Sequence, residues 1–181
     1  MKVDRRQTIL STGRIRITTW MPSDLHDLAA LHADPLTMRF IGYGRPETVD
    51  EARVRILEYR DEHRVRGWTK WRVESVAGDM IGRAGFGQGD EGRELAYALR
   101  PDNWNRGLGT EIAAALVRWH YEHPPGDESS RGRLCAYVEV GNSASIRVLE
   151  KVGFTLVDRR SHKGAICDFF RLPAAAGSST A

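Results

Sequence analysis

The chain has 181 residues, of which 41% are hydrophobic and 28% are charged, and its net charge at pH 7 is +3. These proportions are typical of one folded globular domain and exclude a disordered chain, while the longest apolar run, residues 112–117, is too short to cross a bilayer. The 27 basic residues are spread along the whole chain among acidic ones, so we expect no direct nucleic-acid binding; a phosphate-bearing cofactor or an acidic partner fits this mild positive bias.

One domain is expected over residues 13–172, between a loose lead-in over 1–12 and a disordered tail over 173–181. The lead-in lacks the apolar stretch of a secretory signal, and the tail is a short segment rich in Ala and Ser. Cys135 and Cys167 make neither a disulfide framework nor a zinc quartet. We therefore expect a cytoplasmic protein with no membrane association and no metal.

The first predicted elements are a strand and two helices. Alternating apolar residues predict a strand over 14–20, and Pro22 is placed to begin a helix. A second helical pattern runs over 48–65. The candidates for the buried faces of these helices are Leu25, Leu28 and Leu31 in the first and Val54, Ile56 and Leu57 in the second.

The middle of the chain changes from the helical period to the strand period and back. Strands are predicted over 68–76, 80–86 and 94–99, with tight turns between them, which is a β-meander. After Pro101 the period of 3.6 returns and predicts a long helix over 107–121. Its apolar stripe consists of Leu108, Ile112, Ala115, Leu116 and Trp119.

The C-terminal third predicts a strand, a short helix and a hairpin. After a polar loop over 123–132 come a strand over 134–140 and a helix over 143–152. Two final strands, over 154–159 and 165–172, form the hairpin. The whole order, β-α-α-β-β-β-α-β-α-β-β, predicts a mixed α/β fold in one layered domain.

The segment LRPDNWNRGLGT, residues 99–110, joins a strand to a helix through a glycine-bearing loop. A helix N-terminus exposes backbone N–H groups and a partial positive charge. Gly107 and Gly109 lack side chains that would block an anion, and Arg106 adds a full charge. The segment is neither a P-loop nor a dinucleotide fingerprint. It predicts a pyrophosphate cradle, although a plain loop that uses glycine to begin a helix has the same pattern.

A second segment, VGNSASIRVLEKVGF, covers residues 140–154. Asn142 is suited to cap the helix, and the Ser145 hydroxyl stands where it can point back toward the helix start. The core-facing residues are Ile146, Leu149 and Val152. By itself this is the pattern of an ordinary capped helix.

Together the two segments resemble the GNAT superfamily of acetyl-CoA-dependent N-acetyltransferases, and within it the RimJ/RimL branch. The likeness covers residues 13–172 and rests on ELAYALRPDNWNRGLGTEIAAAL and NSASIRVLEKVGF, in the family's order and at about its spacing. The resemblance implies a central, mostly antiparallel twisted sheet flanked by helices. It also implies that acetyl-CoA lies wedged between two splayed parallel strands.

The resemblance also implies roles for individual residues in binding acetyl-CoA. The pyrophosphate would be wrapped by the backbone of Asn105, Arg106, Gly107, Leu108, Gly109 and Thr110. Leu99 and its neighbours would bind the pantetheine arm like an added strand, while Asn142 and Ser145 would reach the thioester end from the opposite side. The loop pattern departs from the general family motif at Trp104, a departure that the RimJ/RimL branch shares.

Two residues are candidates for proton transfer. Glu94 begins the strand before the loop, where this branch often carries a carboxylate, and it could accept the proton of the attacking amine; a glutamate on the surface of a half-exposed strand fits the same pattern. Ser145 could protonate the departing thiolate or serve only the helix start. The superfamily often uses a tyrosine on a late strand for this step, but residues 166–170 contain none, which shifts the role to Ser145 or solvent.

The acceptor amine is expected to be an α-amine. An α-amine with a pKa of about 7.7–8.0 is far more often neutral at pH 7 than a lysine amine near 10.4, and the sequence has no dense acidic cluster to help a lysine. An α-amine or another amine of low pKa is therefore favoured, and the resemblance to the RimJ/RimL branch implies a protein N-terminus. Transfer would be direct, in a ternary complex, by a monomer or homodimer. Residues 37–45 and 161–164 are expected to shape the acceptor pocket.

Two other functions remain open from the sequence. One is acetylation of a small-molecule amine such as an aminoglycoside, a polyamine or an amino acid, since one fold serves many substrates. The other is a sensor or interaction domain that binds an acyl-CoA without turnover. The Gly107 and Gly109 loop fits cofactor binding in each case.

Overall fold

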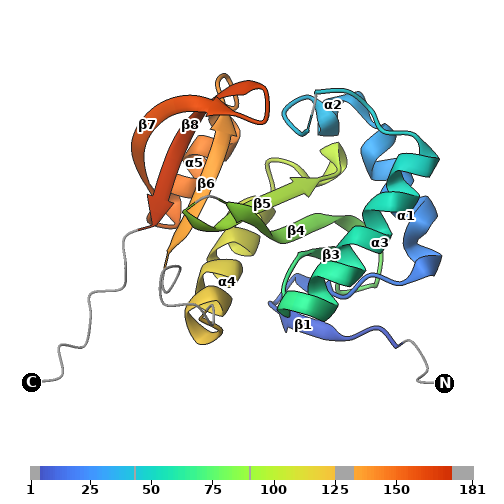
Figure 1. The fold of residues 1–181 in the computed structure, drawn as a ribbon. Helices are drawn as coiled ribbons and strands as arrows, with labels where there is room; N and C mark the ends of the chain where they lie inside the picture. The colour runs from blue at the N-terminus through green and yellow to red at the C-terminus, as the bar shows by residue number, and fades with distance from the viewer. Residues whose placement is uncertain (1–4, 43, 90, 125–132, 173–181) are drawn as a thin grey trace, which may run out of the picture.

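The computed structural model describes residues 5–42, 44–89, 91–124 and 133–172. They form a mixed α/β fold around an eight-stranded sheet with the order β1-β2-β3-β4-β5-β6-β8-β7 (Figure 1). The strands are β1 (Thr8–Ser11), β2 (Ile15–Thr18), β3 (Lys70–Ser75), β4 (Met80–Gly89), β5 (Gly92–Leu99), β6 (Leu134–Glu139), β7 (Thr155–His162) and β8 (Ala165–Leu172). The helices are η1 (Pro22–Asp24), α1 (Leu25–Ala33), α2 (Pro35–Met38), α3 (Val49–Arg66), η2 (Pro101–Asn103), α4 (Leu108–Glu122) and α5 (Ser143–Lys151). The predicted fold class is confirmed.

Two expectations about the N-terminal half are wrong. Residues 8–11, expected in a loose lead-in, form the edge strand β1, which pairs antiparallel with β2; so short an edge strand has little periodicity to reveal it. Val54 and Leu57 are 56% and 61% exposed. Of the three candidates only Ile56 is buried, and it forms the buried stripe of α3 together with Ala52 and Tyr59, because a spacing of four and three residues keeps them on one helix face.

The other local predictions match the structure. The meander is β3, β4 and β5, and all five residues predicted for the stripe of the long helix are buried on α4. Asn142 caps α5, because its side chain accepts a hydrogen bond from the Ser145 backbone N–H over 3.2 Å. The tail over 173–181 and most of the loop over 123–132 lie outside the described residues.

The two faces of the sheet carry different cores. One large cluster joins the sheet to α4 and α5 and includes Trp71, Phe86, Ile112 and Leu116. A smaller cluster, with Leu28 and Ile56, belongs to α1 and α3. Figure 1 shows α1 and α3 to one side of the molecule, and α5 with β6 to β8 on the other. No helix within the described residues is long and apolar enough to cross a membrane.

One pair of strands in the sheet, β5 and β6, is parallel, and its pairing is short. Registered pairs are Arg93 with Leu134 and Glu94 with Cys135. Beyond them β5 runs on to Leu99 while β6 separates from it (Figure 1). We call the opening between the two strands beyond Glu94 the splay. It is the feature that the predicted fold requires for a cofactor.

Candidate active site

The loop before α4 presents backbone groups to solvent at one end of the splay. Asn105 and Gly107 both have left-handed backbone angles, with φ of 56° and 75°. Arg14 holds the loop, because its Nη1 donates to the Arg106 carbonyl over 2.9 Å and its Nε donates to Glu111 over 2.6 Å. The first N–H groups of a helix have no acceptor within it. The exposed loop therefore combines free amides with the Arg106 charge.

Gly109 was expected to leave room for an anion, but its missing side chain faces packed residues. A Cβ on this residue would lie 3.4 Å from Tyr97 and 3.5 Å from Val148. The absent side chain faces the packing of α4 against β5 and α5, so it does not widen the mouth of the loop. The Leu108 side chain is buried as well. Leu108 and Gly109 can therefore offer a ligand only backbone groups.

The edge of β5 along the splay has backbone groups turned away from β4. The Arg100 N–H donates to the Ile81 carbonyl over 2.9 Å, and antiparallel pairs alternate between bonded and non-bonded residues. The amide groups of Leu99 and Tyr97 therefore face the splay. The Leu99 carbonyl accepts a hydrogen bond from Trp104 Nε1 over 2.8 Å. Leu99 thus lies at the edge of the splay, with its carbonyl already engaged.

Tyr97 is a candidate site residue that the sequence analysis did not single out. Its hydroxyl donates to Ser145 Oγ over 3.3 Å, joining β5 to the first turn of α5. Burial raises the pKa of the Tyr97 hydroxyl, so it is protonated near neutral pH. The sequence did contain a signal for this position. Leu95, Tyr97 and Leu99 alternate along the strand, so their side chains share one face, and the Tyr97 hydroxyl lies on the α4 side of the sheet.

Glu94 is buried, with 8% of its surface exposed, at the point where pairing of β5 and β6 ends. Lys163 Nζ lies 3.0 Å from one carboxylate oxygen, and His162 Nε2 lies 3.5 Å from the same oxygen. The His162 ring stacks on Tyr137 at 3.6 Å between centroids. A solvated surface glutamate is therefore excluded, since the β7–β8 hairpin closes over the carboxylate.

The two segments predicted to shape the acceptor pocket meet across one groove of about 430 Å³. Gly42 and Gly44 line one side, and Lys163 and Gly164 of the hairpin line the other. Tyr43 lies outside the described residues. Lys163 belongs both to this groove and to the Glu94 contact, so one side chain joins the groove to the carboxylate.

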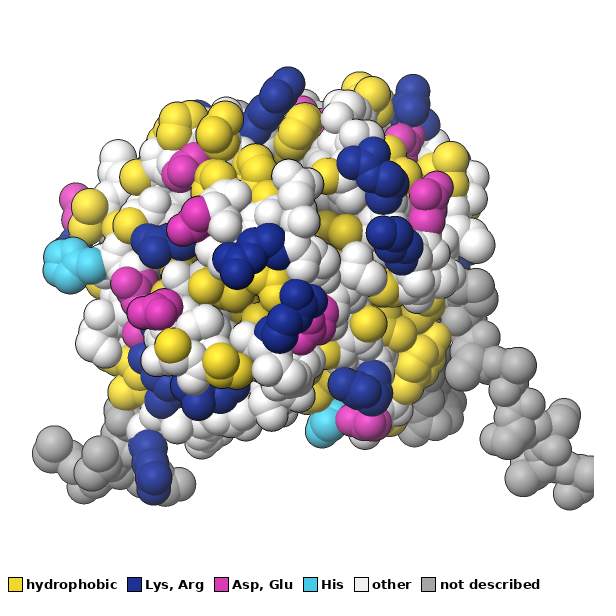
Figure 2. Space-filling model, turned by 180° about the vertical axis from the view of Figure 1, so that it is seen from behind, with side chains coloured by type: hydrophobic (Ala, Val, Ile, Leu, Met, Phe, Trp, Pro, Cys, Tyr) yellow, Lys and Arg dark blue, Asp and Glu magenta, His cyan; other side chains and the backbone are white. Residues whose placement is uncertain are grey.

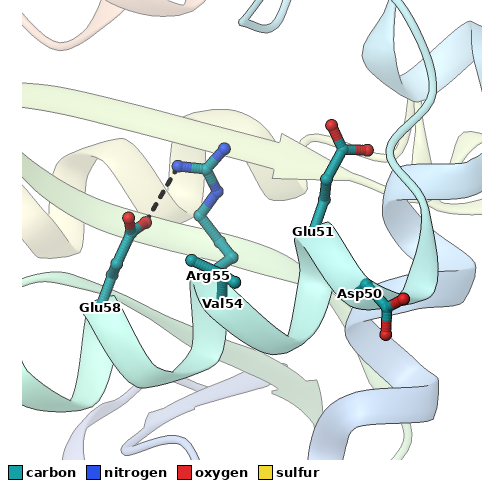
Figure 3. A pocket seen from close by; sticks show the side chains of 5 residues that line it. All are labelled: Asp50, Glu51, Val54, Arg55 and Glu58. Atoms are coloured by element: carbon teal, nitrogen blue, oxygen red, sulfur yellow. Dashed lines mark hydrogen bonds and ion pairs between the residues drawn. The ribbon is translucent and has the colours of Figure 1, made fainter.

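A second hollow, of about 300 Å³, lies on the outer face of α3 (Figure 3). Its lining comes from a single helix, and Arg55 within it turns to Glu58 over 3.1 Å. Basic and acidic side chains are interspersed over the face shown in Figure 2 and do not gather into a basic block. Among the described residues, no group of three or more His, Cys, Asp or Glu side chains is arranged to hold a metal ion.

Comparisons with known proteins agree with this geometry. A family model described as acetyltransferase (GNAT) domain matches residues 14–155. YoaA of Bacillus subtilis (strain 168), described as an uncharacterized N-acetyltransferase, is 24% identical over 150 residues, which cover 81% of this chain and 82% of that protein.

Two solved structures share the fold. RimL, a ribosomal L7/L12 alpha-N-protein acetyltransferase in complex with coenzyme A, is 16% identical with a TM-score of 0.72, covering 91% of this chain and 96% of that one. AAC(6')-Ib in complex with ribostamycin and coenzyme A is 17% identical with a TM-score of 0.71, covering 87% and 92%. At these identities the likeness concerns the fold, and it does not single out the RimJ/RimL branch. Because the family model matches residues 14–155, which are most of this chain, the chain belongs to the GNAT acetyltransferase family.

Proposed function

We propose that this acetyltransferase moves an acetyl group from acetyl-CoA to a primary α-amine, with a protein N-terminus as the favoured acceptor. The observation that carries the proposal is the buried Glu94 carboxylate at the start of the splay, opposite the pair formed by Tyr97 and Ser145. A proton acceptor and a proton donor thus flank one opening.

The residues around the splay fit acetyl-CoA. The pyrophosphate would be held by the exposed loop at Asn105, Arg106 and Gly107 and by the first amides of α4. The pantetheine arm would lie along the β5 edge at Tyr97 and Leu99. Bound there, acetyl-CoA supplies an activated acetyl thioester, and the chain supplies positioning and proton transfer.

Glu94 would take the proton of the acceptor ammonium, directly or through water. An α-amine with a pKa of about 7.7–8.0 needs little help at neutral pH, so one carboxylate suffices. The acceptor ammonium would replace the Lys163 ammonium that now lies 3.0 Å from Glu94. On the other side of the splay, Ser145 Oγ accepts the Tyr97 hydrogen bond, which leaves the serine proton available for the departing thiolate.

The first experiment measures free thiol released from acetyl-CoA over a panel of amines. The panel contains peptides with a free α-amine and blocked lysines, the converse peptides, a polyamine and an aminoglycoside. We expect turnover with the α-amine peptides. Turnover confined to lysine peptides or polycations contradicts the proposed acceptor, and an acetyl-CoA-dependent rise in Tm without turnover identifies a binding domain instead of an enzyme.

A further inference from the structure

A set of charged side chains lies on the face of the sheet that α1 and α3 cover. Residues directly opposite each other in antiparallel strands point to the same face, and the register pairs Lys70 with Gly85, Arg83 with Arg72, and Glu94 with Gly87. The residues of β4 and β5 that lie between these charges on the same face are small: Gly85, Gly87, Ala96 and Ala98. Next to Glu94, this face of the sheet is therefore nearly bare backbone, and the cations of Lys70 and Arg83 lie along it.

Arg72 and Arg83 are register partners with different surroundings. Arg72 is buried and neutralised, with Asp27 at 2.6 Å and Glu74 at 3.3 Å. Arg83 is equally buried, but its Nε donates to His32 Nε2 over 2.9 Å. Among the described residues, Nη1 and Nη2 of Arg83 make no hydrogen bond and no ion pair.

His32 is a neutral partner for Arg83. Its Nε2 accepts from Arg83, so the ring proton is on Nδ1, which lies 2.7 Å from Glu47. Burial, and next the charge of Arg83, lower the pKa of His32 to about 4. Glu47 itself is engaged by Arg55 at 2.7 Å, the arginine visible in Figure 3. Among the described residues, the charge of Arg83 is thus not met by a carboxylate in direct contact.

Lys70 places a second cation beside Arg83. A Cβ on Gly87 would lie 3.1 Å from Lys70 Nζ and 3.9 Å from Glu94 Cβ, so the ammonium lies over Gly87 next to Glu94. It faces the Tyr59 ring at 5.9 Å, and within the described part of the chain it forms no hydrogen bond or ion pair. Burial lowers its pKa to about 8, so most of it still carries a proton at pH 7.

Buried cations are costly unless an anion pairs with them. We propose that the acceptor carries an anionic group, a carboxylate close to its amine, which Arg83 and Lys70 bind while Glu94 receives the amine. This rests on the proposed function and narrows its substrate class. The carboxylate belongs either to a free amino acid or to an acidic side chain at a peptide N-terminus. Polycationic acceptors are disfavoured because the same two residues repel them.

The test compares acceptors that differ only in this carboxylate: alanine with alaninamide, and Asp-Ala-amide with Asn-Ala-amide. We expect the carboxylate member of one pair to have a KM about 10- to 100-fold lower. A preference for alanine over alaninamide identifies the carboxylate of a free amino acid, and a preference for Asp-Ala-amide over Asn-Ala-amide identifies an acidic side chain at a peptide N-terminus. The amine of alaninamide is less basic than that of alanine, so more of it is neutral and able to attack at neutral pH. Without an anion site the amide should therefore be the better acceptor, which is the opposite of the expected preference. Equal use of both members in both pairs overturns the inference but leaves the acetyltransferase proposal intact.

Variants separate binding from a structural role. Lys70→Met and Arg83→Met should remove the preference by raising KM for the carboxylate acceptor alone, whereas Lys151→Met, at an exposed position of α5, should keep it. If Arg83→Met does not fold, Lys70→Met and the wild-type comparison decide. A Lys70→Met enzyme with the full preference contradicts the assignment.

A binding measurement tests the same site without turnover. N-acetylalanine should raise Tm at concentrations where N-acetylalaninamide does not, and Lys70→Met should abolish the difference. An anion-dependent shift without turnover supports the anion site while contradicting the proposed function. Equal shifts with the two probes count against the anion site.

Discussion

The Tyr97 hydroxyl donates a hydrogen bond to Ser145 Oγ over 3.3 Å, between residues 48 positions apart in the chain. Because the serine oxygen accepts this bond, its own proton is free to be donated elsewhere. The bond also differs from the helix cap, which uses the Ser145 backbone N–H and the Asn142 side chain. The proposed chemical role and the structural role of this segment therefore belong to different atoms.

Ser145→Ala should lower kcat about tenfold with little change in Tm. The thiolate of CoA, similar to a thiol of pKa about 8.5, leaves tolerably without help, so the expected loss is modest. Asn142→Ala is the matched control: it should cost about 0.5–2 kcal/mol of stability through the lost cap and spare kcat at a temperature where it is folded. A Ser145→Ala enzyme with wild-type kcat contradicts the acid role.

Tyr97→Phe removes the hydrogen bond to Ser145 and should lower kcat less than Ser145→Ala does. In the proposed mechanism Tyr97 acts through Ser145, so the double variant should be no slower than Ser145→Ala alone. Single-turnover rates of the three variants measure this coupling. Additive losses would mean that Tyr97 acts independently of the serine.

Glu94→Gln should lower kcat at neutral pH by about 10²-fold, the range expected for loss of a general base, and leave acetyl-CoA affinity nearly unchanged. Lys163→Met removes the same ion pair while keeping the carboxylate. If Glu94 accepts a proton, the Lys163 variant should retain kcat within about threefold. Equal losses in both variants would show that closing the hairpin, not proton transfer, is what Glu94 provides.

Arg106→Met should weaken acetyl-CoA binding about tenfold, as expected for one charge-assisted contact of ~1.5 kcal/mol. The residue is exposed and only its backbone carbonyl is held by Arg14, so Tm without ligand should not change. Titration calorimetry at two salt concentrations measures the effect, which should shrink at high salt. Arg118→Met, exposed near the other end of α4, should match wild type.

The free energy of unfolding should fall as the pH drops from 6.5 to 4, because His32 stays neutral in the folded protein over this range. Its folded pKa is about 4, below its ordinary 6.5, so between these values the unfolded chain binds more protons. The contribution is complete above pH 6.5 and is lost toward pH 4, and it is on the order of 3 kcal/mol. Denaturant unfolding should show a flatter pH profile for His32→Asn than for His26→Asn, since His26 is exposed on the same helix.

Local sequence determined the features that depend on near neighbours. The stripe from Leu108 to Trp119 lies on one face because of the helical period, and Asn142 caps α5 because its side chain reaches the N–H of the third residue on. The loop before α4 follows from the glycine at Gly107, where φ is 75°. Periodicity failed on α3, because Val54 and Leu57 lie on its exposed side and only packing against α1 distinguishes the faces of that charged helix.

Only the tertiary structure decided what surrounds the reactive groups. Lys163 reaches Glu94 across 69 positions, because the sheet order places β8 next to β6 and returns the β7–β8 hairpin to the end of the parallel pair. His32 meets Arg83 across 51 positions because α1 covers the face on which register places that arginine. The local pattern of polar and apolar residues predicts hairpins between neighbouring strands, but it does not specify which distant strands pair, such as β5 with β6 and β6 with β8. The sequence by itself therefore determined where a glycine-bearing loop and a capped helix lie, and the packing of distant segments determined which charges meet beside them.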